Sequence, residues 1–348
     1  MSVLTVKSDE FKTFPSVLQD YAHYNLAIKG NIEKTVCEYL LDLRTFFRFY
    51  IMQKNGENFN PDKFSKISIS KISIDDIRNI TNEDIIRYLV FAGLERKNTP
   101  GTRMRKLSAL KSFFHYVYVR KHYIDSNPTS DIDAPKKNKT LPKYLTVEES
   151  VNLLTAIKSD TESKTVIRDF AIVTLFLNTG MRLSELVGLT LDSFDSELNT
   201  VKVLGKGGKE RIIYLNDAAK SAVIDYLRLR LDPKYINTSD KAFFLSGRQT
   251  RISPKTVQWM VYKYLDLAGL GLKGLSVHKL RHTAATLMYQ SGKVDIRVLK
   301  DILGHEQLNT TQIYTHVVDR NIEEAVANNP LSDLKIARKF KTYEDDIE

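Results

Sequence analysis

The segment 126–143 does most to constrain the fold, because it interrupts the pattern of apolar residues on both of its sides. It reads SNPTSDIDAPKKNKTLPK and contains three prolines, a group of lysines and few apolar residues. Proline removes a backbone donor and restricts the residue before it, so the segment is predicted to be an extended linker. Thr146 and Glu149 follow as a capping-box pattern, which starts a helix. The chain is therefore predicted to form two domains, as its 348 residues also favour.

The part of the chain before this linker is predicted to be helical. Residues 31–54 and 102–121 place apolar residues three and four positions apart, which builds one apolar stripe along each helix. A further helix is predicted at residues 84–94. Residues 56–74 are polar and rich in Ser, Lys and Ile, and are predicted to be a loop or a short insertion.

The part after the linker is predicted to be mainly helical with one small antiparallel sheet. Residues 201–204 and 211–215 have the composition of strands, and the glycine-rich GKGGKE between them suits a hairpin turn. Helices are expected at residues 168–178, 183–189, 218–231, 253–268, 280–291 and 294–303. The predicted division is an N-terminal helical domain (1–130), a linker (131–143), a second domain (144–325) and a C-terminal tail (326–348).

The composition indicates which kind of partner the protein binds and which compartment it occupies. The formal net charge of +10 favours a polyanionic partner, although many basic proteins bind no nucleic acid. A single cysteine, Cys37, allows no disulfide within the chain and no cysteine metal site, and it favours a reducing, cytoplasmic compartment. The sequence has no signal-peptide pattern and no apolar run of membrane-spanning length, so no membrane association is expected.

The helix at 102–121 carries the clearest basic surface. Residues 96–121 contain eight lysines and arginines and no acidic residue. Arg103 and Lys106 lie three positions apart, so they are expected to share a face away from the apolar stripe. We predict DNA contacts for Arg103, Arg105, Lys106 and Lys111, because such a face can meet a phosphate backbone or enter a major groove. The alternative is an ordinary solvated helix face.

The second domain holds two polar groups that suit an anion. Arg182 follows a helix break at Gly180, where its guanidinium can bind two phosphate oxygens, and Glu185 lies on the same face and can orient it. His278 and Arg281 open another helix, whose N-terminus favours anions. An ordinary surface ion pair remains the alternative for the first group. Neither an HExxH motif nor a carboxylate cluster occurs, so no metal site is predicted.

Three further residues have chemistry that matches these groups. Lys206 lies in the hairpin turn, where a lysine can donate a proton to a leaving oxygen, but spacing alone does not distinguish it from Lys209. His305 follows Gly304, which suits a left-handed helix cap. Tyr314 is expected at the edge of the core. Each of these residues, considered alone, is better explained as a solvated or packing side chain.

Together, the stretches TGMRLSEL, VLGKGGKERIIYL, VHKLRHTAATLM and LGHEQLNTTQIYTH resemble the tyrosine recombinase (phage-integrase-like) family, most closely its bacterial Xer-type members. TRMRKLSALKSFFHYV and the prolines of the linker are similar as well, so the resemblance covers about residues 25–325. It implies a two-domain clamp on double-stranded DNA, with a core-DNA-binding domain at 1–130 and a catalytic domain at 144–325. A homotetramer would recombine two DNA sites without a cofactor.

The resemblance also implies a role for each matched residue. Arg182 and Arg281 would hold the scissile phosphate, with Glu185 supporting the first. Lys206 would be the general acid, and His278 and His305 would donate hydrogen bonds to the phosphate, His278 also helping to deprotonate the nucleophile. Tyr314 would be that nucleophile and form a 3′-phosphotyrosyl bond. Glu306 departs from the pattern, since small polar or apolar residues are usual after LGH.

Several alternatives stay open at this point. The resemblance fits chromosome or plasmid dimer resolution as well as integration or excision of a mobile element, and an activating partner protein is not identified. A type IB topoisomerase-like enzyme would use the same chemistry as a monomer. A non-catalytic DNA-binding regulator could share the scaffold, although the intact residue set argues against it. The tail at 326–348 has spaced apolar residues and is predicted to dock on a neighbouring subunit.

Overall fold

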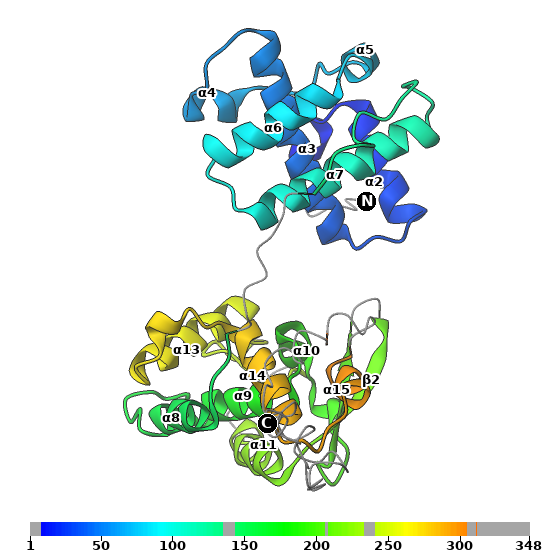
Figure 1. Cartoon of the computed structure of the whole chain (residues 1–348). Helices are drawn as coiled ribbons and strands as arrows, with labels where there is room; N and C mark the ends of the chain where they lie inside the picture. The colour runs from blue at the N-terminus through cyan, green and yellow to red at the C-terminus, as the bar shows by residue number, and fades with distance from the viewer. Residues whose placement is uncertain (1–7, 135–142, 206–207, 233–240, 305–310, 312–348) are drawn as a thin grey trace, which may run out of the picture. The chain divides into compact units, whose positions relative to one another are not determined.

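The computed structural model describes residues 8–134, 143–205, 208–232, 241–304 and 311. The chain forms two compact units, residues 1–139 and 140–348, and the boundary falls inside the proline-containing segment (Figure 1). Each unit has a hydrophobic core of its own. The two units are described separately below.

Helices joined by turns make up the described residues of the first unit. Helix α3 packs against α2, α4, α6 and α7, and α6 also packs against α7. The helices are α1 (Ser8–Lys12), α2 (Ser16–Ala27), α3 (Glu33–Lys54), α4 (Pro61–Lys66), α5 (Ile74–Arg78), α6 (Asn82–Leu94) and α7 (Pro100–Val119).

Aromatic rings fill the centre of this unit. Phe46 on α3 lies edge-on to Tyr88 of α6 at a centroid distance of 5.2 Å, and Phe47 lies edge-on to Phe113 of α7 at 5.8 Å. All four side chains are fully buried. Burying one such ring stabilises the fold by about 2–3 kcal/mol, and the edge-to-face geometry adds about 1 kcal/mol. These pairs therefore fix α3 against the two later helices.

Residues 56–74, predicted to be a loop or a short insertion, contain helix α4, which the prediction did not include. The side chain of Asn60 accepts hydrogen bonds from the backbone N–H groups of Asp62 and Lys63, both at 3.1 Å, and Pro61 occupies the first helical position. Phe64 is buried against Phe91 of α6. A helix of six residues is too short to display an apolar repeat, so periodicity could not reveal it.

The second unit is mainly helical with a two-stranded antiparallel sheet, which confirms the predicted fold class. Helix α9 is buried over most of its surface and packs against α8, α11 and α14. The elements are α8 (Val147–Lys158), α9 (Val166–Thr179), α10 (Leu183–Gly188), η1 (Leu191–Ser193), β1 (Thr200–Leu204), β2 (Glu210–Tyr214), α11 (Asp217–Arg230), α13 (Pro254–Leu267), η3 (Gly271–Lys273), α14 (Val277–Gln290) and α15 (Ile296–Leu303).

Local signals account for the ends of several of these elements. The capping box of α8 is present as predicted, with reciprocal hydrogen bonds between Thr146 and Glu149. In the hairpin, Thr200 pairs with Tyr214 and Leu204 with Glu210, which leaves the glycine-rich turn between the two strands.

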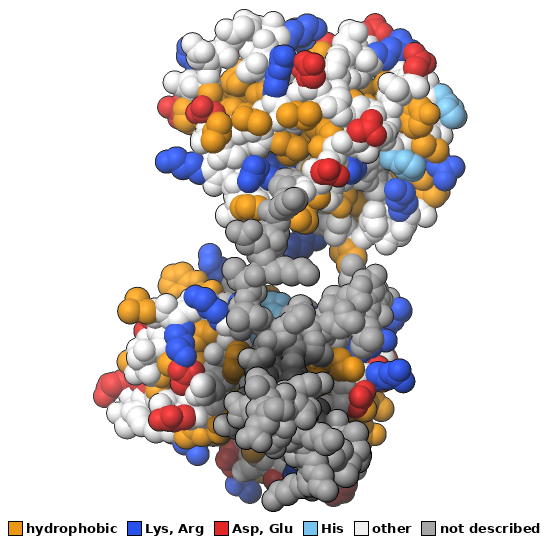
Figure 2. Space-filling model, in the orientation of Figure 1, with side chains coloured by type: hydrophobic (Ala, Val, Ile, Leu, Met, Phe, Trp, Pro, Cys, Tyr) orange, Lys and Arg blue, Asp and Glu red, His pale blue; other side chains and the backbone are white. Residues whose placement is uncertain are grey.

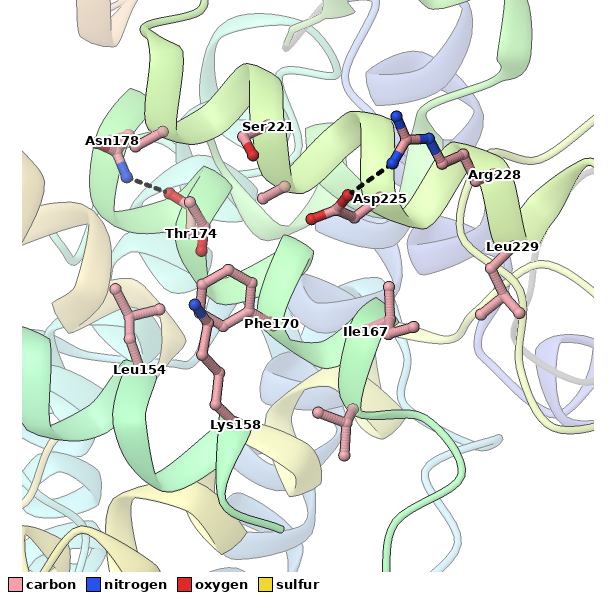
Figure 3. A pocket seen from close by; sticks show the side chains of 13 residues that line it. Leu154, Lys158, Ile167, Phe170, Thr174, Asn178, Ser221, Asp225, Arg228 and Leu229 are labelled. Carbon is pink, nitrogen blue, oxygen red and sulfur yellow. Dashed lines mark hydrogen bonds and ion pairs between the residues drawn. The ribbon is translucent and has the colours of Figure 1, made fainter. Parts of the chain in front are cut away.

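A groove of about 780 Å³ lies among α8, α9 and α11 (Figure 3). Its wall is largely apolar, and Lys158 lies over the ring of Phe170 with its Nζ 4.5 Å from the ring centroid. Asn178 lines the end of the groove on α9 and donates a hydrogen bond to the carbonyl of Thr174. The groove contains none of the residues predicted to act in catalysis.

Candidate active site

The break between α9 and α10 places Arg182. Helix α9 ends at Thr179, and Gly180 follows in the left-handed conformation with φ of +61°. A Cβ atom at this position would lie 2.9 Å from the side chain of Leu303, so close packing as well as backbone conformation favours glycine. The chain then turns, and Arg182 becomes the residue that caps α10.

Glu185 is the acceptor that orients Arg182. The Arg182 backbone N–H donates to Glu185 Oε2 at 2.7 Å, and Arg182 Nη1 donates to Glu185 Oε1 at 2.8 Å. The Glu185 side chain has no exposed surface, whereas about a third of the Arg182 side chain is exposed. Burial acts to raise the pKa of Glu185, but hydrogen bonds from Arg211 and Arg182 outweigh it and hold the pKa below its usual value. Glu185 is therefore ionised at neutral pH.

Arg281 is held more deeply than Arg182. It lies in the first turns of α14 and is only 3% exposed. Its Nη1 donates to the carbonyl of Gly180 at 2.8 Å, and its Nη2 donates to the carbonyl of Leu303 at 2.6 Å. The guanidinium thus links the end of α9 to the end of α15, and these contacts fix its plane.

Gly304 completes the junction between these helices. It caps α15 in the left-handed conformation with φ of +62°, and its carbonyl accepts from Arg182 Nη2 at 2.8 Å. Arg182 and Arg281 therefore bind two consecutive carbonyl groups, those of Gly304 and Leu303. The structure brings together three of the predicted residues, Arg182, Glu185 and Arg281. They lie at the end of α15, and His305 is the next residue in the sequence.

His278 stands near the same group on the first turn of α14. Desolvation lowers the pKa of its imidazole below the ordinary value of 6.5, and the positive charges of Arg281, Lys279 and Arg182 lower it further. Its ring packs edge-on against that of His282, with centroids 4.7 Å apart. The side chain of His278 is exposed and therefore accessible. Its lowered pKa favours the neutral imidazole at pH 7.

Three predicted residues, Lys206, His305 and Tyr314, lie outside the described residues, as do Glu306 and the tail from 326. The turn that carries Lys206 is described at its ends. The Gly205 backbone N–H donates to the carbonyl of Lys209 at 2.7 Å, and Gly208 has φ of +78°. Lys209 is exposed. The choice between Lys206 and Lys209 as general acid stays a prediction.

Arg211 is a member of this cluster that the sequence interpretation missed. It donates to both carboxylate oxygens of Glu185, with Nη2 at 3.0 Å from Oε2. A signal was available, because Arg211 alternates with the buried Ile213 and therefore lies on the inward face of β2. An arginine on the inward face of a strand needs an anionic partner, and Glu185 is that partner.

The basic helix α7 presents only part of the predicted surface. Arg105 and Lys111 are exposed and Arg103 is half-buried, but Lys106 is buried at 8% exposure. Lys106 donates to Asp42 of α3 at 2.9 Å, so the expectation that it lies on an open face is wrong. Helical spacing locates a residue around the axis, but a buried carboxylate on the neighbouring helix decides which way its long side chain extends.

Two further features concern metals and membranes. Among the described residues, no group of three or more His, Cys, Asp or Glu side chains is placed to hold a metal ion. Within the same residues, no helix is long and apolar enough to cross a membrane.

On the face shown in Figure 2, basic and acidic side chains are interspersed, so the excess positive charge forms no single patch there.

The chain is similar to proteins of known class over most of its length. Residues 143–321 match the model of the phage integrase family. The chain is 46% identical over 319 residues to the tyrosine recombinase XerC of Caldanaerobacter subterraneus subsp. tengcongensis, covering 92% of this chain and 88% of that protein. It is 31% identical to the tyrosine recombinase XerD of Halalkalibacterium halodurans, covering 91% of this chain and 98% of that protein.

Solved structures show the same fold. The XerH site-specific recombinase bound to a palindromic difH substrate matches with a TM-score of 0.65 and 22% identity, covering 90% of this chain and 94% of that one. A lambda integrase (75–356) dimer bound to a COC′ core site matches with a TM-score of 0.61 and 20% identity, covering 85% and 96%.

The family match and the tyrosine recombinase relatives define the class of protein, an enzyme that cuts and rejoins DNA strands. The chain belongs to the phage integrase family and is a site-specific tyrosine recombinase of the Xer type. Its reaction proceeds through a covalent phosphotyrosine, which is the general mechanism of this family.

Proposed function

We propose that Arg182 and Arg281 bind the non-bridging oxygens of the scissile phosphate. The observation that carries the proposal is their anchoring on the consecutive carbonyls of Gly304 and Leu303, directly before His305 in the sequence. An in-line attack on a phosphodiester gathers negative charge on the equatorial oxygens. Cations that are already held in place stabilise this charge without reorganising during the reaction.

We propose that Tyr314 attacks the phosphate and that Lys206 protonates the leaving 5′-oxygen. A phenol has a pKa of about 10, so it needs a cationic site or a base to react at neutral pH. The lowered pKa of His278 supports a role in accepting that proton, because a neutral imidazole can act as a base. His305 would donate a further hydrogen bond to the phosphate. The phosphotyrosyl bond conserves bond energy, so rejoining by a 5′-hydroxyl needs no nucleotide.

We propose that residues 1–130 form the core-DNA-binding domain, residues 144–325 the catalytic domain and residues 131–143 the linker between them. Exposed Lys111 on α7 supports a phosphate-facing surface in the first domain. Arg105 is exposed as well, but its guanidinium is paired with Asp42 and Glu38. Arg103 and Lys106 belong to the same predicted set, although the Asp42 pair limits the reach of Lys106. A homotetramer on two DNA sites is the proposed assembly, with cytoplasmic DNA as the substrate.

Two biological roles remain candidates, namely dimer resolution of chromosomes or plasmids and integration or excision of a mobile element. Similarity to XerC and XerD proteins over about nine-tenths of the chain supports the first. We propose that the tail at 326–348 docks on a neighbouring subunit. Deleting it should leave single-site cleavage measurable and reduce tetramer formation and strand exchange, as sizing of the synaptic complex would detect. Unchanged assembly would refute the docking role.

Trapping the covalent intermediate tests the proposed chemistry. The substrate is a DNA site nicked beside the cleavage position, so that a short fragment diffuses away and the adduct accumulates. The full chain should form an adduct in EDTA, and Tyr314→Phe should form none while retaining DNA binding, because one oxygen is lost and the ring is kept. An adduct in the Tyr314→Phe protein would disprove the nucleophile. Strand exchange between two sites distinguishes the enzyme from a topoisomerase-like monomer.

A further inference from the structure

Glu185 is shared between two arginines that come from different elements. Arg182 donates to it from the start of α10, and Arg211 donates to both of its oxygens from β2. The carboxylate has no exposed surface, and the Arg211 side chain is 16% exposed. One negative charge therefore balances two positive charges in a region with little water, where charge interactions are stronger than at the surface.

Arg211 also lies against the cap of α15. A Cβ atom built on Gly304 would come within 3.0 Å of Arg211 Cδ and 3.1 Å of its Nε and Nη1. Among the described residues, the buried Nε group has no hydrogen-bond partner, and the two Nη groups bind the carboxylate. The arginine thus packs on the backbone of Gly304, whose carbonyl binds Arg182.

Arg211 lies close to the turn of the hairpin. Arg211 pairs with Val203 in the sheet, one step from the end pair of Leu204 with Glu210. The turn beyond that end pair contains Lys206. The side chain of Arg211 therefore connects the base of the lysine-bearing turn to Glu185 and to Gly304. These are the two residues that accept hydrogen bonds from the Arg182 guanidinium.

We propose that Arg211 is a positioning residue for DNA cleavage. It competes with Arg182 for Glu185, so that Arg182 keeps a net positive charge for the phosphate. It also holds the hairpin in register with Arg182. The inference rests on the proposed role of Arg182. Without Arg211, the full charge of Glu185 would act on Arg182 alone. The phosphate would then meet a neutralised ion pair in place of a cation.

Charge and geometry can be separated by two substitutions of similar size. Arg211→Lys keeps the positive charge but cannot bind both carboxylate oxygens as a planar fork. Arg211→Gln keeps a hydrogen-bond donor and removes the charge. We expect single-turnover cleavage of the nicked DNA site, at saturating DNA, to be at least about tenfold slower for Gln than for Lys, because one removed charge-stabilising group costs a step of this size or more.

The decisive variant is the double substitution Arg211→Gln with Glu185→Gln. Removing the carboxylate relieves the neutralisation of Arg182, so cleavage should recover by at least about threefold over Arg211→Gln alone. Removing both partners of a buried pair can also restore stability, so thermal unfolding is measured alongside. Recovery of cleavage that only follows a higher unfolding midpoint would overturn the proposal. Equal rates for the Lys and Gln variants, or no recovery in the double variant, would overturn the proposal.

Controls keep the result interpretable. Lys202→Gln removes a cation from the same hairpin, where Lys202 pairs with the exposed Glu210 at 3.3 Å, and it should leave the cleavage rate unchanged. Thermal unfolding of each full-length variant identifies any that fail to fold, and the Lys–Gln comparison remains if the double variant does so. If the unsubstituted protein forms no adduct, the proposed chemistry itself fails; if it forms one and the Arg211 variants match it, only this inference fails.

Discussion

Arg182 and Arg281 donate to the carbonyl oxygens of two consecutive residues at the end of α15, at 2.8 Å and 2.6 Å. One guanidinium comes from the cap of α10 and the other from α14, so their relative placement depends on the position of a single peptide segment. A small movement of that segment would displace both cations together. This relationship makes the α15 cap a sensitive part of the site.

Substitution of Arg281 should separate catalysis from stability. Arg281→Lys keeps the charge but cannot reach the Gly180 and Leu303 carbonyls with fixed geometry, so cleavage should fall about 100-fold or more. Arg251→Lys is the matched control, since Arg251 also donates to two carbonyls, those of Val187 and Leu189, outside the cluster. Adduct formation and thermal unfolding would be measured for both. Similar loss of cleavage in the two variants would contradict a special role for Arg281.

The Gly304 cap can be tested against a glycine with the same backbone conformation. Gly304→Ala places a Cβ against Arg211 at a φ of +62°, and should cost roughly 2–3 kcal/mol of stability and slow cleavage. Gly269→Ala has a φ of +71° with no atom near the added Cβ, so it should cost only about 1 kcal/mol and leave cleavage unchanged. Denaturant unfolding supplies the difference. Equal destabilisation by Gly304→Ala and Gly269→Ala would show that the Arg211 side chain can move away from the added Cβ at no cost in stability.

The pH dependence of cleavage should reflect His278. Its pKa lies below 6.5 in the free protein, so the imidazole is neutral at pH 7 and gains a proton only as the pH falls further. The rate at subsaturating DNA reports the free enzyme, and it should decline on the acid side with a midpoint below 6.5. His278→Gln should lower the rate and remove this decline. A midpoint above 6.5 would mean that the folded protein favours the protonated form.

The same lowered pKa sets the direction of a stability effect. The unfolded chain binds the proton at about pH 6.5, more readily than the folded protein does. The contribution of His278 to stability is therefore complete above pH 6.5 and decreases as the pH falls toward the folded pKa. Between pH 7.5 and about pH 5.5, the unfolding midpoint of the protein should fall by more than that of His278→Gln. An equal fall in the two proteins would contradict the lowered pKa.

The choice of general acid can be made with a modified substrate. A 5′-bridging sulfur leaves as a thiolate without protonation, so Lys206→Ala should slow cleavage of normal DNA at least about 100-fold more than cleavage of the sulfur-containing DNA. Lys209→Ala, in the same turn, should affect both substrates equally. The reverse pattern would transfer the role to Lys209, and equal slowing by Lys206→Ala would exclude Lys206.

Local patterns in the sequence were sufficient for much of the fold. The apolar repeat predicted α3 and α7, the capping box predicted the start of α8, and the glycine-rich turn predicted the pairing of β1 with β2. The short helix α4 was missed, because one buried Phe64 in six residues produces no repeat. These successes and this failure have the same cause, since helix periodicity and capping depend on residues within a few positions of each other.

The sequence by itself determined which chemical groups the chain carries, through the order and spacing of the motifs around Arg182, Arg281 and His305. Only the tertiary structure decided that Arg182 binds a carbonyl 122 residues away, that Arg211 shares Glu185, and that Lys106 turns inward to Asp42. The physical reason is that a buried charge takes its orientation from whichever partner the packed helices bring near it. Such a partner lies close in space and far along the chain, where no local pattern can identify it.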